Sequence, residues 1–484
     1  MKNENLRKKS IGAVVWSALE AVFKNGLQFI ISVVLARLIL PEEFGTIALL
    51  YLFTGITAVF IDSGFPSALV QRQNTTYNDE CTVFWLNVIL GVVASLLLWM
   101  ASPLIAGFYD KPILTDLTAV LALSLFINSL GSIHTTLLTK ELNFKKLMVI
   151  NASATGVSGL VAIVMALEGY GVWALAAQVL VTSIVTTITL WATHKWRPSF
   201  IFSAESMRNL FAFGSYLMMS NMLDRIYMRL YTILLGKFYD VKELAFYSRA
   251  DRTHMLPVDV LSGVLSRVAY PIFSATSQDK ARLLRGLKLA LEGIMLINVP
   301  MMLGLMATAD SVVPVLFGDN WLPAVPILKV LCLHGVLWPV HVLNLNVLKA
   351  QGMTNVFFRL EIIKKIIGTT MIFACLPWGA IGVAWSQVIS SLINFYVNAY
   401  YTKRNLGYGF VDQWIDITPV IAASAVMAGA IYFIPVSTSF SLIYTLLIQV
   451  FAGVAIYAAL CLGFKIRAYN QFIMLLRERK AKQA

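Results

Sequence analysis

The sequence predicts an all-α polytopic membrane protein, with about fourteen transmembrane helices in two six-helix lobes and a C-terminal helix pair. Apolar residues make up 58% of the 484 residues, and the mean hydropathy is +0.75. Only 13% of the residues are charged, whereas soluble proteins carry roughly 25%. Apolar runs that are long enough to cross a bilayer recur along the whole chain, and Lys and Arg gather between them.

The predicted spans are runs of about 20 mostly apolar residues, the length that a helix needs to cross a membrane. They are 11–37, 44–62, 80–102, 114–137, 148–167, 172–193, 212–236, 246–272, 287–307, 324–348, 358–377, 380–401, 417–435 and 442–463. The first run is too long for a signal peptide and no small-residue cleavage site follows it, so we interpret it as an uncleaved helix.

Short connections indicate that the chain holds no soluble module, and we divide it into three parts. The N-terminal lobe is 1–205 (spans one to six), the C-terminal lobe is 206–405 (spans seven to twelve), and 406–484 holds spans thirteen and fourteen and a basic tail.

Alternate connections are basic, starting with the segment before the first span. The positive-inside rule therefore predicts an even number of spans and two cytoplasmic termini.

The two halves of the chain share short matches at a constant offset. The tripeptide Phe108-Tyr-Asp110 matches Phe317-Gly-Asp319, and Gln178-Val179 matches Gln387-Val388, each pair being 209 residues apart. Six predicted spans separate the members of a pair. Because six is an even number, the pattern predicts a parallel repeat, which is one of the known transporter arrangements.

Composition and motifs argue against several classes of function. The net charge is +13, but the basic residues lie in loops and tails, which is the pattern of a membrane protein rather than of a nucleic-acid-binding protein. The four cysteines are far apart and have no metal-ligand spacing. No Walker motif and no catalytic constellation is found. We therefore expect no enzyme activity, no cofactor, no metal and no nucleic-acid partner.

Ionisable side chains within the spans are the main functional candidates, because a charge in the bilayer is costly and usually faces a cavity or a partner. Glu20 and Lys24 lie one helical turn apart in the first span, either as a neutral packing pair or as a cation that faces a cavity. The seventh span holds Asp224 and Arg225, and Asp62 ends the second span. In the eleventh span we assign Lys365 to the cytoplasmic edge.

The eighth span is too polar to face lipid, so we expect it to line an aqueous cleft between the lobes. Its charged residues are Arg249, Asp251, Arg252, Asp259 and Arg267. A salt-bridge network within the helix is the alternative interpretation. A cationic cleft attracts phosphate or diphosphate, since arginine forks fit phosphate oxygens.

Two sets of site residues follow from these patterns. The diphosphate-binding candidates are Lys24, Arg225, Arg249, Arg252 and Arg267. The carboxylates could bind a proton or Na⁺, or pair with the cations. These ion-coupling or charge-pairing candidates are Glu20, Asp62, Asp224, Asp251 and Asp259.

The order of several motifs resembles the polysaccharide exporters of the multidrug/oligosaccharidyl-lipid/polysaccharide superfamily, most of all the branch for colanic-acid-type and teichuronic-acid-type repeat units. Pro41-Glu-Glu-Phe44-Gly45 and Leu138-Thr-Lys140-Glu141-Leu-Asn-Phe144 carry part of the likeness. The other segments are 35–37, 62–65, 71–72, 85–87, 108–112, 270–273, 317–321 and 349–352. The resemblance runs through the twelve core spans and fades after about residue 405.

The resemblance implies a two-lobed flippase of the bacterial inner membrane that works by alternating access. Members of the family move undecaprenyl-diphosphate-linked repeat units to the periplasmic leaflet. Polysaccharide polymerase and chain-length machinery are the implied partners, beside membrane lipids. Lys24 and Arg252 stand at positions comparable to basic residues of related flippases. Many members have arginine where this chain has Lys24, so a bidentate phosphate contact is not expected there.

Two alternative functions remain open at this point. An ion-coupled multidrug antiporter of the same superfamily shares the twelve-span core, although a cationic cavity does not suit it. A membrane-embedded polymerase or glycosyltransferase would need a large loop for its catalytic groups, and no connection is long enough.

Overall fold

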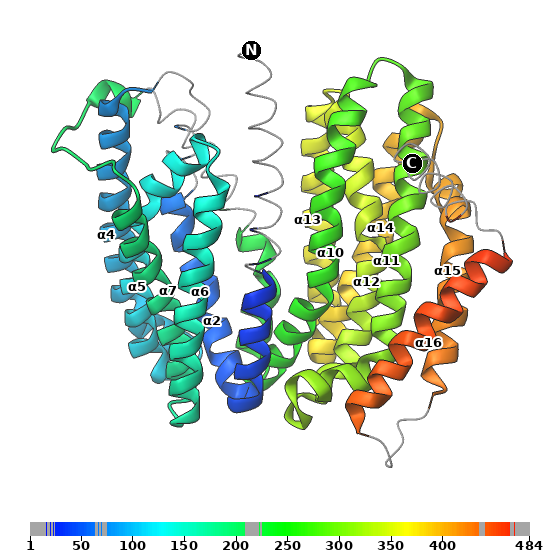
Figure 1. Ribbon diagram of the computed structural model, residues 1–484, viewed down its shortest axis with the longest axis horizontal. Coiled ribbons are helices and arrows are strands. Elements are labelled where there is room, and N and C mark those ends of the chain that lie inside the picture. Colours follow the sequence, from blue (N-terminus) through cyan, green and yellow to red (C-terminus); the bar gives the residue numbers. More distant parts are fainter. Residues whose placement is uncertain are drawn as a thin grey trace, which may run out of the picture. The chain divides into compact units, whose positions relative to one another are not determined.

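The structure is a computed structural model, and Figure 1 shows its helices. It describes residues 25–62, 75–208, 225–434 and 441–464, and the single residues 16, 20, 23, 66, 69, 222 and 469. Every regular element in these ranges is a helix. The helices are Asn25–Leu38, α2 (Pro41–Asp62), α4 (Tyr77–Phe108), α5 (Ile113–Lys140), α6 (Phe144–Leu167), α7 (Val172–Thr193), α9 (Leu230–Phe238), α10 (Val241–Ala275), α11 (Lys280–Phe317), η1 (Asp319–Trp321), α12 (Ala324–Ala350), α13 (Thr354–Cys375), η2 (Leu376–Trp378), α14 (Gly379–Leu406), α15 (Phe410–Tyr432) and α16 (Leu442–Gly463).

Ten apolar runs in the described helices are long enough to cross a membrane, which confirms the predicted all-α polytopic fold. One of these runs, Asn355–Leu406, contains both α13 and α14. Each of the fourteen predicted spans overlaps a described helix. However, these ten runs do not include α10, and α9 and Asn25–Leu38 are short. The number fourteen therefore stays a prediction.

Several helices are longer than the apolar runs that predicted them. The prediction for span nine was 287–307, but α11 extends from Lys280 to Phe317. Asp279 caps its first turn by accepting hydrogen bonds from the backbone N–H groups of Ala281 and Arg282. The helix ends at Gly318, whose φ of 91° suits glycine. Hydropathy marks only the lipid-facing part of such a helix, whereas the caps set its ends.

The contacts divide the chain into two compact units, Met1–Ala245 (unit 1) and Phe246–Ala484 (unit 2). In unit 1, α4 packs on α5, α5 on α7 and α6 on α7. The corresponding contacts in unit 2 are α11 with α12, α12 with α14 and α13 with α14. This common pattern supports the predicted parallel repeat. The helices α15 and α16 pack on α11 and so complete unit 2.

The motif at the start of α2 holds several elements of unit 1 together. Glu42 forms ion pairs with Lys111 (3.3 Å) and with Lys242 (3.6 Å). Gly45 lies so close to the start of α10 that a Cβ there would be 2.0 Å from the carbonyl oxygen of Val241. Two residues of a motif that carries the family resemblance thus have structural roles.

A buried amide cluster joins three helices of unit 2. The Nδ2 atom of Asn344 in α12 donates to Oε1 of Gln413 in α15 at 2.9 Å, and Nε2 of Gln413 donates back to Oδ1 of Asn344 at 3.0 Å. The hydroxyl of Thr402 in α14 donates to the same Oδ1 atom at 2.6 Å. All three side chains are buried. The cluster therefore fixes the register of α12, α14 and α15 through paired polar groups.

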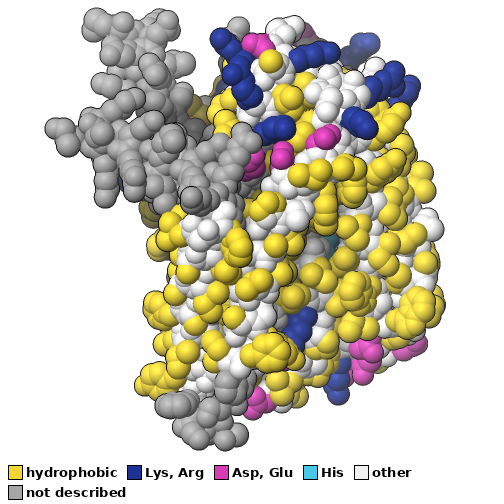
Figure 2. All heavy atoms as spheres, turned by 90° about the vertical axis from the view of Figure 1, so that its right-hand side faces the viewer, with side chains coloured by type: hydrophobic (Ala, Val, Ile, Leu, Met, Phe, Trp, Pro, Cys, Tyr) yellow, Lys and Arg dark blue, Asp and Glu magenta, His cyan; other side chains and the backbone are white. Residues whose placement is uncertain are grey.

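Charged side chains gather near the two ends of the face that Figure 2 shows, and a broad hydrophobic band lies between them. Such a band is what a surface in contact with lipid tails requires.

In unit 2, Lys288 pairs with Asp416 near the start of α11, and Lys329 pairs with Asp310 near its end. Burial, and then the hydrogen bond to Asp416, raise the pKa of Tyr408 in the loop before α15, so that its hydroxyl remains the donor.

Candidate functional site

The helix α10 places a charged surface on unit 2. It is one uninterrupted helix despite Pro257 and Pro271. Arg252 and Asp259 are both exposed, and their spacing of seven residues puts them on one side of the helix, two turns apart. Exposed charges on a helix of membrane length need a polar environment rather than lipid. This side of α10 is therefore a candidate substrate-binding surface.

Arg249 lies only three residues from Arg252 but has different surroundings. It is 7% exposed, and its guanidinium carbon lies 4.9 Å from the ring centre of Phe317 and 4.7 Å from that of Trp321. Two aromatic faces around one buried cation form a strong cation–π arrangement. The contact anchors α10 to the end of α11 and to η1, which is a structural role.

The other candidates on α10 differ in what the structure describes. Asp251 is 32% exposed, and its Oδ1 atom lies 3.9 Å from Nδ1 of His254. The side chain of Arg267 lies outside the described residues. Asp251 therefore extends the charged surface toward the interior of unit 2.

The candidates in unit 1 are only partly described. Glu20 accepts a hydrogen bond of 2.8 Å from Nδ2 of Asn151 in α6, and this contact ties the first span to α6. Arg225 is exposed. Lys24, Asp224 and the side chain of Asp62 lie outside the described residues. The proposed pairing of Glu20 with Lys24 therefore stays a prediction.

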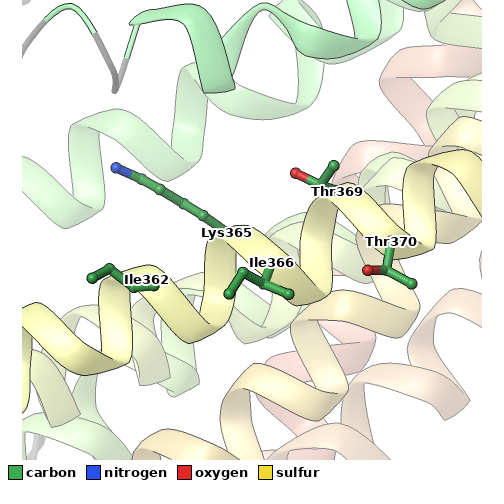
Figure 3. A pocket seen from close by; sticks show the side chains of 5 residues that line it. All are labelled: Ile362, Lys365, Ile366, Thr369 and Thr370. Atoms are coloured by element: carbon green, nitrogen blue, oxygen red, sulfur yellow. The ribbon is translucent and has the colours of Figure 1, made fainter.

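A hollow of about 340 Å³ on α13 contains a cation that we had assigned to the membrane edge. Its lining is Ile362, Lys365, Ile366, Thr369 and Thr370. Figure 3 shows Lys365 and Thr369 extending from the same side of the helix, with the ammonium group reaching away from it. A cation and hydroxyl groups beside apolar side chains suit the head group of an anionic lipid.

Lys365 lies half-way along α13 (Thr354–Cys375). We expected it at the edge because the apolar run begins only a few residues before it. Its spacing to Thr369, four residues further on, could have identified it, since these two positions share one side of a helix. The neighbouring Lys364 pairs with Glu361.

The described residues hold no group of three or more His, Cys, Asp or Glu side chains that could bind a metal ion. The four cysteines are buried and free. The site candidates are therefore the charged surface of α10 and the hollow on α13. Both belong to unit 2, and both combine cations with apolar surroundings.

The chain is similar to several known proteins over most of its length. It is 28% identical over 476 residues to the teichuronic acid biosynthesis protein TuaB of Bacillus subtilis (strain 168), covering 96% of this chain and 97% of that protein. It is 27% identical over 404 residues to the lipopolysaccharide biosynthesis protein WzxC of Escherichia coli (strain K12), with 81% of each chain covered.

The fold is similar to that of a solved membrane transporter. The lipid II flippase MurJ, in an inward closed conformation, matches with a TM-score of 0.76 and 15% sequence identity. The match covers 95% of this chain and all of that structure. Residues 34–326, more than half of the chain, match the family described as polysaccharide biosynthesis protein, and the chain therefore belongs to this family.

Proposed function

We propose that the protein is a flippase that moves lipid-linked oligosaccharide repeat units from the cytoplasmic to the periplasmic leaflet by alternating access. The repeat units would serve the synthesis of a surface polysaccharide such as a capsule, O-antigen or exopolysaccharide. Membership of the polysaccharide biosynthesis family over residues 34–326 carries the proposal. The likeness to the fold of a lipid II flippase supports it.

The cations of unit 2 fit an undecaprenyl-diphosphate carrier. Arg252 on the exposed side of α10 can bind a diphosphate through two parallel N–H···O contacts. Lys365 offers a point charge in the hollow on α13, where the hydroxyls of Thr369 and Thr370 can donate to phosphate oxygens. Lys24, Arg225 and Arg267 stay candidates for the same role.

The charge pattern supports a position in the bacterial inner membrane with both termini in the cytoplasm. The first turns of α11 hold three cations, Lys280, Arg282 and Arg285. These residues precede predicted span nine, in a connection that we assign to the cytoplasm. Transport rather than catalysis is the proposed activity, with a proton or Na⁺ as the coupling ion. A polymerase and its chain-length machinery would use the repeat units in the periplasmic leaflet.

A deletion strain tests the proposal. We expect loss of surface polysaccharide together with accumulation of lipid-linked repeat units, and the wild-type gene should reverse both. Arg252→Gln and Lys365→Met should fail to restore export at a normal protein level. Each removes a charge-assisted contact, which corresponds to substrate binding about 10- to 100-fold weaker.

Two matched variants serve as controls. Arg359→Gln removes an exposed charge from the same helix as Lys365 but not from its hollow, and Arg282→Gln removes one that pairs with Asp279. Both should restore export. Unchanged polysaccharide in the deletion strain, together with altered drug sensitivity, would contradict the proposal and favour a multidrug antiporter.

A further inference from the structure

Two histidines from different helices meet inside unit 2. The ring centres of His254 in α10 and His334 in α12 are 5.8 Å apart. His254 has no exposed surface, and Nδ1 of the partly exposed His334 is also enclosed. On the other side of His254, its Nδ1 atom lies 3.9 Å from Oδ1 of Asp251. His254 is therefore an enclosed imidazole that lies between two partly exposed side chains, the carboxylate of Asp251 and the imidazole of His334.

Three of the four ring nitrogens of this pair are enclosed and have no hydrogen-bond partner in the part of the chain that the structure describes. Neither ring nitrogen of His254 makes a hydrogen bond within the described residues, and neither does Nδ1 of His334. Asn298 of α11 donates through Nδ2 to the carbonyl oxygens of Gly335 (3.0 Å) and Val336 (3.1 Å), but its enclosed Oδ1 atom has no donor. Leaving several enclosed polar atoms unpaired is costly, so packing alone does not explain their presence.

The three helices come close together at this level. A Cβ on Gly335 would lie 2.6 Å from Sδ of Met302 in α11 and 3.4 Å from a ring carbon of His254. The absence of a side chain at Gly335 therefore lets α10, α11 and α12 enclose the histidine pair. An enclosed site of this kind separates its polar groups from bulk water, which strengthens electrostatic effects within it.

Few other ionisable groups lie near the pair. On α10, Asp251 faces His254, whereas Arg252 and Asp259 are on the exposed side. On α11, Glu292 lies nearly two turns before Asn298, and Asp310 pairs with Lys329. On α12, His341 lies two turns beyond His334 and bonds to Ser391 and Asn398 of α14. On α13, Lys364 pairs with Glu361.

We propose that His254 and His334 form a proton-binding site within unit 2, with Asp251 as the counter-ion of the protonated pair. The added proton forms an N–H bond on an unpaired imidazole nitrogen and comes from water that reaches Asp251 or His334. Two imidazolium ions at this separation repel each other, so the pair accepts one proton at a time. Imidazole nitrogens suit a proton better than Na⁺, because hard cations prefer oxygen ligands.

Protonation of this pair would couple a proton gradient to the movement of the lipid-linked saccharide. This coupling rests on the proposed function, whereas proton binding at the pair does not. The site also suits a switch between two states of the helices, since a charged pair strengthens the contact with Asp251 and a neutral pair does not.

Proton uptake by the purified full-length protein in lipid nanodiscs tests the binding site directly. It should be titrated from about pH 8 down to about pH 3, because an enclosed imidazole gains its charge at a lower pH than an exposed one. The double variant His254→Gln, His334→Gln should take up one proton fewer than the wild type. His341→Gln is the matched control, because His341 lies on α12 like His334 but both of its ring nitrogens are hydrogen-bonded. Its replacement should leave the uptake unchanged. Equal uptake by the wild type and the double variant would overturn the proposal.

A second measurement tests the coupling. Liposomes with the wild-type protein should move lipid-linked repeat units faster when a pH gradient is imposed, and His334→Gln should keep the basal rate but lose this acceleration. His334 is partly exposed, so its replacement is expected to preserve the fold if the double variant does not fold. Retained acceleration in His334→Gln would overturn the coupling. A wild-type protein that moves no repeat units would refute the proposed function, and the uptake experiment would still decide the proton site.

Discussion

Replacement of Arg249 by methionine tests whether this cation is structural or binds substrate. Arg249 is 7% exposed, and its guanidinium carbon lies 4.9 Å from the ring centre of Phe317 and 4.7 Å from that of Trp321. A desolvated cation–π contact contributes about 2 kcal/mol, so the two rings together account for about 4 kcal/mol at most. Removing a buried charge also removes the cost of its desolvation. We therefore expect a net destabilisation of about 2 kcal/mol.

The assay is unfolding of the purified protein in mixed micelles, followed by tryptophan fluorescence. Trp321 lies at the altered contact, so its local environment should also change. Arg252→Met is the control, because it removes an exposed arginine one turn further along the same helix and should change stability by less than about 0.5 kcal/mol. Normal stability of Arg249→Met combined with lost export would refute the structural role and return Arg249 to the substrate site.

Three further predictions concern packing and substrate binding. Gly45→Ala should lower the stability and the membrane yield of the protein, because the new Cβ would lie 2.0 Å from a backbone oxygen. Gly55→Ala in the same helix is the control, since its Cβ would enter open space. It should stabilise the protein by about 0.5 kcal/mol in thermal unfolding. Asn344→Ala and Gln413→Ala should each lower the free energy of unfolding by about 1–3 kcal/mol, because each single replacement leaves the other side chain buried without its partner. In a double-mutant cycle, the double variant should lose less stability than the sum of the two single variants. Lys365→Arg should restore export at least in part while Lys365→Met should not, and equal export by both would exclude a role for the charge.

The overall fold could be predicted because hydropathy and charge act over long segments. Apolar runs predicted where helices lie, and the 209-residue offset predicted that the contacts of unit 1 recur in unit 2. Helix ends could not be predicted as well. The last ten residues of α11 lie beyond the predicted span, and its end depends on the local backbone at Gly318.

The candidate site was less predictable, because burial depends on neighbours from distant segments. Arg249 and Arg252 are three residues apart in the sequence, yet only Arg249 contacts Phe317 and Trp321, which follow it by 68 and 72 residues. The packing of α11 and η1 was needed to distinguish the surroundings of the two arginines. Lys365 was assigned to the membrane edge because it lies near the start of an apolar run, and the structure adds that its helix starts at Thr354 and that Lys365 lies half-way along it.

The histidines illustrate a second limit of the sequence. His254 and His334 are 80 residues apart and belong to no motif, so their spacing gives no hint of a pair. Only the approach of α10 to α12 at Gly335 brings the two rings together. Polar groups that are enclosed without partners are recognisable in a structure and not in a sequence.

The most direct test of the account is a flipping assay with the purified protein in liposomes. Lipid-linked repeat units that accumulate in the deletion strain would be incorporated on one leaflet, and their exposure to a membrane-impermeant lectin would be followed with time. We predict that the wild-type protein moves the repeat units to the opposite leaflet and that Lys365→Met is strongly impaired while Arg359→Gln is not. Repeat units that stay on the original leaflet in the presence of folded wild-type protein would contradict the proposed flippase function.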